Sequence, residues 1–371
     1  MEYKVTYIVK SKLHFYPPCV TQIRLLNELG VNVDVIYGSC ENNVLKLFEK
    51  EGIPYKALCD VRGKFRGRFD KLYNWYTFRK ALNKELNSRD LTNTILWFGN
   101  AETVLPMKGL LEGKKYAISF LELLDDHPYR MKLLKKLAQN SLFNVSCEET
   151  RSYIFRYWWN LKTLPYTMPN KPFDPPALFN EISDSQASEL IKKIGDKKII
   201  ILQGYIKEFD ILKNFASAMN RLSEEYVLLL MGPEAPDVVN PLLKISDKII
   251  YSKYIPAPNH LQVTQKAYIG IVYYNGLESL NNAFCAPNKI YEYSAFGLPM
   301  LANDIPGLKN TVGSCSAAIC CDLSEEAIVK AVTKIEENHD FMKEAALQFY
   351  NKTNCRDIMK KIITENLIYN S

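Results

Sequence analysis

Short, uninterrupted apolar segments recur along this chain, and stretches with helical patterning separate them. In the first half, the segments cover residues 3–9, 31–37, 53–58, 94–98, 115–121 and 142–146. They lack the polar alternation of strands with one solvent-exposed face, so we expect helices to cover both faces of their sheet. Short apolar strands with helical spacers indicate parallel strands joined by right-handed crossovers. The sequence therefore predicts an α/β fold.

A proline-rich stretch interrupts this pattern near the middle of the chain. Between residues 164 and 176 it contains Pro165, Pro169, Pro172, Pro175 and Pro176. Such a density of prolines favours a semi-rigid linker over a helix or strand, although a long surface loop would also fit.

Beyond the prolines the alternation starts again. Apolar strands are predicted over 198–204 and near 226–232, and each stops at a glycine. The chain is predicted to end in two helical stretches, near 324–348 and 354–368, with no strand after them. The second half therefore has a build similar to the first.

Length and composition allow two domains, each with its own core. The chain has 371 residues, of which 47% are hydrophobic, and this exceeds what one ordinary domain needs. We predict an N-terminal domain over 1–168 and a C-terminal domain over 169–350. The segment 351–371 is predicted to be a helix that packs back on the N-terminal domain.

Charge and cysteine content exclude several classes of protein. A net charge of +6 suits anionic small molecules or an acidic membrane surface, but it is too small for a dedicated nucleic-acid binder. The nine cysteines form no C-x-x-C pair and the four histidines are scattered, so no zinc site is predicted. The first apolar segment is too short for a signal peptide, and no apolar stretch reaches membrane-spanning length. These features predict a cytoplasmic protein.

The segment 281–300 carries the richest chemistry. Pro287 suits the first position of a helix, and Gly297 suits its end. The amide end of such a helix can bind phosphate, and Lys289 adds a positive charge in its first turn. Glu292 lies on the same face, where one carboxylate can accept hydrogen bonds from both hydroxyls of a ribose. An ordinary surface helix with a Lys–Glu pair remains the alternative interpretation.

The stretch 286–299 closely resembles the donor-site signature of GT-B glycosyltransferases, especially the family 4 and group 1 type of bacterial polysaccharide enzymes. The resemblance rests on the core Pro-Asn-Lys-x-x-Glu-Tyr, followed by Gly-x-Pro. Weaker similarity covers most of the chain, including Gln203-Gly204 and Met231-Gly232-Pro233. It implies a GT-B fold, with two Rossmann-like domains facing a central cleft. It further implies that Glu292 holds the nucleotide ribose, while Asn288 and Lys289 lie at the diphosphate.

The same resemblance implies an activity. A chain of this type would transfer a sugar from a nucleotide-diphosphate donor to a glycan or polyprenyl-linked acceptor, with retention of configuration, in bacterial surface polysaccharide or glycoconjugate synthesis. No metal or other cofactor is expected, because basic side chains and a helix dipole neutralise the leaving diphosphate. The chain contains no D-x-D triplet, which agrees with this expectation.

Two departures from the family pattern keep other functions open. Many relatives carry a second glutamate where this chain has Phe284, and the loop after the first C-terminal strand offers only Lys207 as a basic residue. A catalytically inactive GT-B-like partner subunit is therefore one alternative. A nucleotide-sugar epimerase on the same architecture is another. A nicotinamide dehydrogenase is disfavoured, because no G-x-G-x-x-G follows either opening strand.

Further candidate residues follow from the resemblance and from strand ends. Those assigned to donor binding are Pro287, Asn288, Glu292, Gly204, Tyr254, Ile255 and Tyr274, with Tyr254 and Ile255 in a loop that contacts the base. Catalytic roles are assigned to Lys289, Lys207, Glu122 and His127. Glu122 and His127 would orient or deprotonate the acceptor hydroxyl, although a surface glutamate and a loop histidine are equally good interpretations.

Basic and aromatic residues are interleaved in two segments. The first comprises Arg62, Lys64, Phe65, Arg66, Arg68, Phe69, Trp75 and Phe78, and the second comprises Arg130, Lys132, Lys135 and Lys136 among apolar neighbours. This pattern can bind nucleic acid, but for an enzyme with a lipid-linked acceptor it better fits an anionic membrane surface. It predicts peripheral attachment to the inner face of the plasma membrane, unless these are only solvated helix faces.

Overall fold

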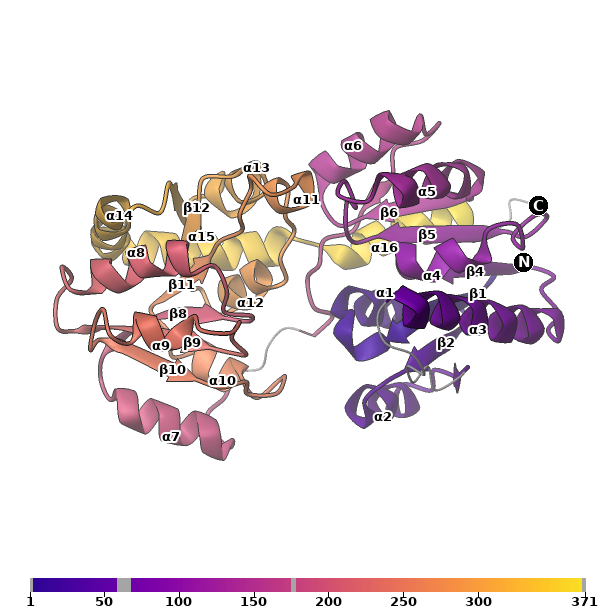
Figure 1. Ribbon diagram of the computed structural model, residues 1–371. Coiled ribbons are helices and arrows are strands. Elements are labelled where there is room, and N and C mark those ends of the chain that lie inside the picture. Colours follow the sequence, from indigo (N-terminus) through magenta and orange to yellow (C-terminus); the bar gives the residue numbers. More distant parts are fainter. Residues whose placement is uncertain (1–2, 59–67, 175–177, 369–371) are drawn as a thin grey trace. The chain divides into compact units, whose positions relative to one another are not determined.

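The computed structural model describes residues 3–58, 68–174 and 178–368, and it divides into two units (Figure 1). Unit 1 comprises Met1–Phe173, Ser279–Asn281 and Asn354–Ser371. Unit 2 comprises Asp174–Glu278 and Asn282–Thr353. Each unit is a parallel sheet with helices on both faces, so the predicted α/β fold is confirmed.

Within its described residues, unit 1 contains a seven-stranded parallel sheet. The strands are β1 (Lys4–Lys12), β2 (Val33–Ser39), β3 (Tyr55–Ala57), β4 (Thr94–Phe98), β5 (Tyr116–Phe120), β6 (Phe143–Ser146) and β7 (Tyr166–Thr167). Their spatial order is β3-β2-β1-β4-β5-β6-β7. The first six follow the Rossmann order, in which the chain leaves β1 to one side and later continues from β4 to the other.

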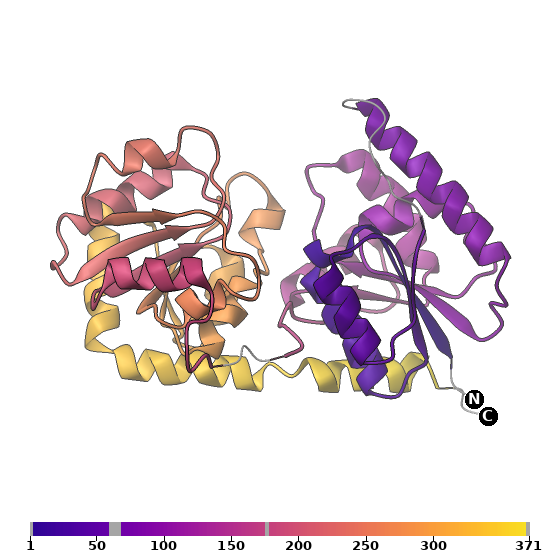
Figure 2. The same cartoon turned by 90° about the horizontal axis from the view of Figure 1, so that it is seen from below.

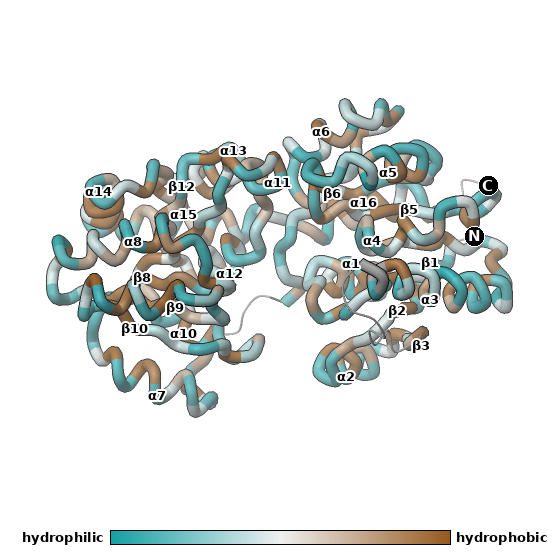
Figure 3. The backbone as a smooth tube through the Cα atoms, viewed as in Figure 1, coloured by the Kyte–Doolittle hydropathy of each residue, from teal (hydrophilic) through white to brown (hydrophobic). Residues whose placement is uncertain are grey.

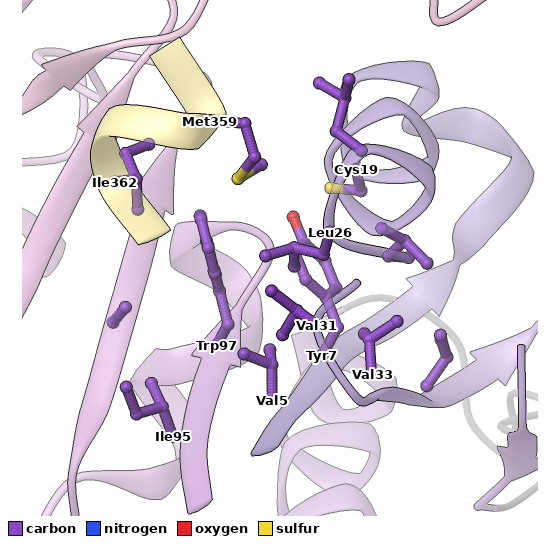
Figure 4. Close-up of a cluster of buried hydrophobic side chains, with 14 of the residues drawn as sticks. Val5, Tyr7, Cys19, Leu26, Val31, Val33, Ile95, Trp97, Met359 and Ile362 are labelled. Carbon is purple, nitrogen blue, oxygen red and sulfur yellow. The ribbon is translucent and has the colours of Figure 1, made fainter. Parts of the chain in front are cut away.

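Helices cover both faces of this sheet. They are α1 (Pro17–Glu28), α2 (Asn42–Lys50), α3 (Arg68–Asn87), α4 (Ala101–Val104), α5 (Pro128–Asn140), α6 (Glu149–Trp159) and α16 (Cys355–Asn366), with short 3₁₀ turns at Leu13–Phe15 and Leu105–Met107. Tyr7 of β1 packs on one face with Leu26 of α1 and Met359 of α16 (Figure 4). On the other face, the ring of Phe120 lies 5.1 Å from that of Phe155 in α6. Alternating side chains of each strand therefore feed two separate core layers.

Unit 2 repeats this plan. Its strands are β8 (Lys198–Gln203), β9 (Tyr226–Met231), β10 (Ile249–Ser252), β11 (Ile269–Val272), β12 (Met300–Asn303) and β13 (Ala318–Cys321). Among the residues the structure describes, these six strands are all parallel and follow the order β10-β9-β8-β11-β12-β13. Apolar residues dominate β8 and β9 (brown in Figure 3), as expected for strands buried on both faces.

The helices of unit 2 also lie on both faces of its sheet (Figure 2). The longer ones are α7 (Ser185–Ile194), α8 (Phe209–Met219), α14 (Glu325–Glu337) and α15 (His339–Lys352). The short ones are α9 (Val239–Leu242), α10 (Leu261–Thr264), α11 (Leu280–Ala283, which divides between the units), α12 (Lys289–Ala295), α13 (Pro306–Leu308) and a π-turn at Lys309–Gly313. Ile201 of β8 packs with α7, α12 and α15, and its neighbour Leu202 packs with α8 and α14.

Three local predictions differ from the structure. Part of the proline-rich stretch is not a linker, because Tyr166–Thr167 forms the edge strand β7 against β6. Prolines are tolerated beside an edge strand because its outer side forms no hydrogen bonds with another strand. The single helix predicted near 324–348 is two helices that meet at Asn338. The short edge strand β13 (Ala318–Cys321) was not predicted. In the described part of the chain, no helix is both long and apolar enough to cross a membrane.

Candidate functional site

A cavity of about 310 Å³ lies in unit 2 at the carboxyl ends of β8 and β11. These strands are neighbours in the sheet, but the chain continues from β8 to β9 on one side and from β11 to β12 on the other. The crevice at such a switch point is where doubly wound folds bind ligands. Gln203 and Gly204 line the cavity from the end of β8, and Tyr274 lines it from the segment after β11.

Two glycines line this cavity at the ends of β8 and β9. Gly232, which follows β9, has a φ of +143°, and a Cβ there would lie 2.0 Å from the carbonyl oxygen of Gly204. Gly204 has a φ of +110°, and its N–H donates to the carbonyl of Met231 at 3.0 Å. Only glycine combines this backbone geometry with such a close approach. The backbone segments that follow β8 and β9 are thus packed directly against each other at the wall of the cavity.

The helix α12 supplies the charged side chains. Its first residue is Lys289 and its N-cap is Asn288, so Pro287 lies just before the cap rather than at the first helical position predicted from the sequence. Gly297 follows the helix with a φ of +68°, as expected for its end. Because α12 spans only Lys289–Ala295, its dipole is small and the charge of Lys289 matters more.

Lys289 is a partly desolvated cation. Burial lowers the pKa of its ammonium from 10.5 to about 8, while the Glu292 carboxylate opposes this shift. The Nζ atom lies 5.9 Å from the ring centroid of Tyr274, and a Cβ on Gly204 would lie 3.7 Å from it. An anion placed over Gly204 would therefore meet a positive charge that has lost much of its hydration.

Glu292 is held by groups from distant parts of the chain. The side-chain amide of Gln203 donates to its Oε2, and the imidazole Nε2 of His260 lies 3.7 Å from the same oxygen. The side-chain carbonyl of Gln203 in turn accepts from the hydroxyl of Thr264 at 2.6 Å. These contacts fix the position of the carboxylate at the cavity wall.

Tyr293 anchors α12 to the sheet. Its ring is fully buried in the space left by Gly270 of β11, where a Cβ would come within 2.4 Å of the ring. Its hydroxyl oxygen accepts from the backbone N–H of Gln203 at 3.3 Å. Burial raises the pKa of Tyr293 well above its ordinary value, so this hydroxyl stays neutral. The helix that carries Lys289 and Glu292 is thereby fixed against the end of β8.

No family model matches this sequence, and no curated protein matches it. Solved structures match its whole length. HepE from Anabaena in complex with UDP has a TM-score of 0.67 at 11% identity, covering 98% of this chain and 99% of that one. A glycosyltransferase from Rickettsia africae has a TM-score of 0.68 at 13% identity and covers 100% of both chains. UDP-GlcNAc 2-epimerase from Neisseria meningitidis bound to UDP-GlcNAc has a TM-score of 0.69 at 12% identity, covering 98% and 100%.

The protein has the GT-B fold. Two Rossmann-ordered parallel sheets in one chain, with these neighbours along the full length, confirm the fold that the resemblance implied. At such low identities the likeness establishes architecture alone, and chemistry must be argued from the residues.

Seven of the residues predicted from the sequence line the cavity of this GT-B protein: Gly204, Tyr254, Ile255, Tyr274, Asn288, Lys289 and Glu292. Five more lining residues were not assigned a role: Gln203, Met231, Gly232, Ala257 and His260. Gln203, Met231 and Gly232 stand in the strand-end segments that carried weak similarity. For His260 the sequence holds no signal, because an isolated histidine without a motif is usually structural.

Pro287, Lys207 and Phe284 are not among the residues that line the cavity. The ammonium of Lys207 pairs with Glu208 at 2.9 Å, and this hydrogen bond raises the pKa of Lys207. The carbonyl of Lys207 accepts from the hydroxyl of Tyr273 at 2.7 Å. Phe284 belongs to a segment whose backbone packs closely on Gly307. The loop with Lys207 is thus held by contacts of its own.

Glu122 and His127 belong to unit 1, between β5 and α5. Glu122 is exposed, and the side chain of His127 is 46% exposed, with its Nε2 3.8 Å from the Asp126 carboxylate. His127 also precedes the first residue of α5 as its N-cap. Their roles toward an acceptor stay predictions.

The basic and aromatic segments are only partly described. Arg62, Lys64, Phe65 and Arg66 lie outside the described residues, and so do the side chains of Arg68 and Phe69. Phe78 is fully buried, so it belongs to the core of unit 1 rather than to a membrane surface. The apolar face of α5 is likewise used internally through Leu134 and Leu137. Of the basic residues in the second segment, Lys132, Lys135 and Lys136 are exposed, whereas Arg130 is partly buried and pairs with Glu102 at 3.2 Å.

Proposed function

We propose that this protein is a glycosyltransferase that uses a nucleotide-diphosphate sugar held by unit 2. The observation that carries the proposal is the cavity at the β8–β11 switch point, where glycine backbone, a desolvated ammonium and a carboxylate meet. A diphosphate needs the first two groups, and a ribose needs the third. The complex of HepE with UDP supports the choice of ligand.

The donor is proposed to lie along the cavity. Its diphosphate would contact the main chain at Gly204 and Gly232 and the ammonium of Lys289. Its ribose would donate to Glu292, and its base would meet Tyr254 and Ile255. The charge of Lys289 would also stabilise the diphosphate as it leaves, because negative charge grows there when the glycosidic bond breaks.

The finer features of the reaction rest on the resemblance of the sequence stretch 286–299. They are retention of configuration, independence of metal ions, help from Lys207 at the leaving group, a glycan or polyprenyl-linked acceptor, and a role in bacterial surface polysaccharide synthesis. Asn288 is proposed to lie beside the diphosphate and Pro287 to shape its loop. Unit 1 is proposed to bind the acceptor, with Glu122 or His127 orienting or deprotonating its hydroxyl.

Attachment to the cytoplasmic face of an anionic membrane is a further proposal, supported by the exposed lysines of α5. Each lysine near such a surface contributes on the order of 1 kcal/mol. Changing Lys135 and Lys136 to glutamate should therefore release the protein from phosphatidylserine vesicles in a sedimentation assay. Equal sedimentation before and after would remove the membrane proposal and leave the donor site untouched.

A nucleotide-sugar epimerase is the second candidate, because the Neisseria epimerase matches as well as the glycosyltransferases do. Incubation with UDP-GlcNAc alone separates the two. An epimerase would invert the sugar at C2 and release it, whereas a retaining transferase would hydrolyse the donor slowly without inversion at C2. An inactive subunit would do neither.

Thermal unfolding with UDP, GDP, ADP, CMP and dTDP tests the proposal. A ligand that binds only the native state raises the melting temperature, by an amount that grows with its concentration over Kd. We expect one nucleoside diphosphate to raise it by several degrees. If all five leave the melting temperature unchanged at millimolar concentration, the proposed donor site is wrong.

A further inference from the structure

The carboxylate of Glu292 ends a chain of buried polar side chains. Gln203 and Thr264 are 5% and 0% exposed, and they come from the end of β8 and from α10. Gln203 joins the two other residues, donating to Glu292 and accepting from the Thr264 hydroxyl. A buried polar chain of this kind is costly unless every member is satisfied, so its geometry is strongly specified.

The charge of Glu292 sets the direction of every bond in this chain. A carboxylate only accepts hydrogen bonds, so the side chain of Gln203 must present its NH₂ group to Glu292 and its carbonyl to Thr264. Thr264 must then donate its single hydroxyl proton to that carbonyl, at 2.6 Å, in preference to the His260 carbonyl at 3.1 Å. No other arrangement satisfies all three groups.

The chain engages only one oxygen of Glu292. Gln203 donates to Oε2, and His260 lies nearest to the same atom. Among the described residues, no hydrogen bond to Oε1 is found. The terminal torsion of a free glutamate is broad, so tethering Oε2 holds Oε1 in one orientation at the wall of the cavity.

We propose that Thr264 and Gln203 are positioning residues that make this site selective for ribose over 2′-deoxyribose. The proposal rests on the proposed function, in which Glu292 meets the ribose. A fixed carboxylate can accept from the two neighbouring hydroxyls at once, whereas a rotating one adapts to a single hydroxyl with little loss. Breaking the hydrogen bonds from Thr264 to Gln203 and from Gln203 to Glu292 should thus lower the affinity for ribonucleotides. The affinity for deoxyribonucleotides should stay nearly unchanged.

The experiment measures the dissociation constants of UDP, ADP and GDP and of their 2′-deoxy counterparts by calorimetry. For the base that binds, we expect the wild type to prefer the ribonucleotide by about tenfold or more, since a hydrogen bond to a charged group is stronger than one between neutral groups. Thr264→Val and Gln203→Met should reduce this ratio to below about threefold. Thr264→Ser keeps the hydroxyl and should keep the ratio.

The ratio distinguishes positioning from general damage, because partial unfolding lowers both affinities equally. A wild-type ratio near one, or an unchanged ratio in both Thr264→Val and Gln203→Met, would overturn the inference while the proposed function survives. A ratio lost equally in Thr264→Ser would show that the hydroxyl is not what matters and would overturn it too. Failure of every nucleoside diphosphate to bind would reject the proposed function together with this inference.

Discussion

The two units share one strand order but treat the same edge of the sheet differently. In unit 2, the ends of β8 and β11 surround a cavity, and Lys289 and Glu292 line it. In unit 1, side chains pack closely at the end of β4, beside β1. A Cβ on Gly99, directly after β4, would lie 2.8 Å from the ring of Tyr7 and 2.9 Å from the sulfur of Cys19.

Several polar groups at this edge of unit 1 are also bonded to each other. The backbone N–H of Lys10 donates to the Thr103 hydroxyl at 2.9 Å, and Asn100 caps α4 by accepting from the N–H of Thr103. Cys19 donates to the Gly99 carbonyl at 3.2 Å, and burial raises the pKa of its thiol to about 12, which keeps it neutral. Topology thus locates a possible site in each unit, and the side chains that stand at this edge differ between the two units.

We expect the largest difference between the two units when a glycine that lines the cavity is replaced. Gly232→Ala would place a methyl group 2.0 Å from a backbone oxygen at a φ of +143°. It should cost about 3 kcal/mol of stability and abolish nucleotide binding. Gly30→Ala in unit 1 is the matched control, with a φ of +83° but no atom within 4 Å. It should cost about 1 kcal/mol in urea unfolding and leave binding intact; equal effects would contradict the contrast.

Removing a carboxylate from each unit should affect nucleotide affinity almost as differently. Glu292→Ala is expected to weaken nucleotide binding about 100-fold, because two charge-assisted hydrogen bonds to ribose would be lost. Glu122→Ala in unit 1 should leave the affinity unchanged. Both constants can be measured by calorimetry with the nucleotide found in the thermal screen. If Glu292→Ala bound as tightly as the wild type, the ribose assignment would be wrong.

Because of the ammonium of Lys289 in unit 2, we expect nucleotide affinity to depend on pH. No residue of unit 1 should contribute to this dependence. Its pKa of about 8 means that the charge needed by a diphosphate is lost as pH rises above that value. Affinity should therefore fall about tenfold between pH 7 and pH 9, while Lys289→Arg, which stays charged, reports only titration of the ligand.

The stability of the ligand-free protein should change with pH in the opposite direction to the affinity. Between pH 8 and 10.5, Lys289 is protonated in the unfolded protein but largely neutral in the folded protein. The free energy of unfolding should therefore rise with pH in this range. Lys289→Met should not show this rise.

The smallest expected effect comes from replacing one buried threonine in each unit and comparing the two variants. Thr103→Val in unit 1 removes the hydroxyl that accepts from the N–H of Lys10 and should cost about 1.5 kcal/mol of stability. It should not change nucleotide affinity or the preference for ribose. Thr264→Val in unit 2 removes a hydroxyl of similar burial and should change that preference. If Thr103→Val altered the preference as well, selectivity would not be a local property of unit 2.

Much of the fold could be predicted because strand and helix periods are local. The apolar run over Lys198–Gln203 is a buried strand as expected, and Gly297 ends its helix as expected. The errors lie where tertiary contacts override local signals. Tyr166–Thr167 stands among prolines yet pairs with Val145–Ser146, because β6 offers an open edge there. The break at Asn338 divides a helical pattern that looks continuous in the sequence.

The charged residues of the candidate site could be predicted from local spacing because they lie on one short helix, whereas Gly204, Tyr254, Ile255 and Tyr274 came from the resemblance and from strand ends. Asn288, Lys289 and Glu292 lie within four residues, so their spacing alone places them together. Gln203 and Thr264 stand 89 and 61 positions from their hydrogen-bond partners, so local spacing does not show that either residue meets Glu292 or its neighbour. Sequence determined which elements form and which short motif carries charge, since these depend on neighbours within a turn. Tertiary structure decided which distant side chains meet that motif and which sheet edge stays open, because crossover order and packing bring them together.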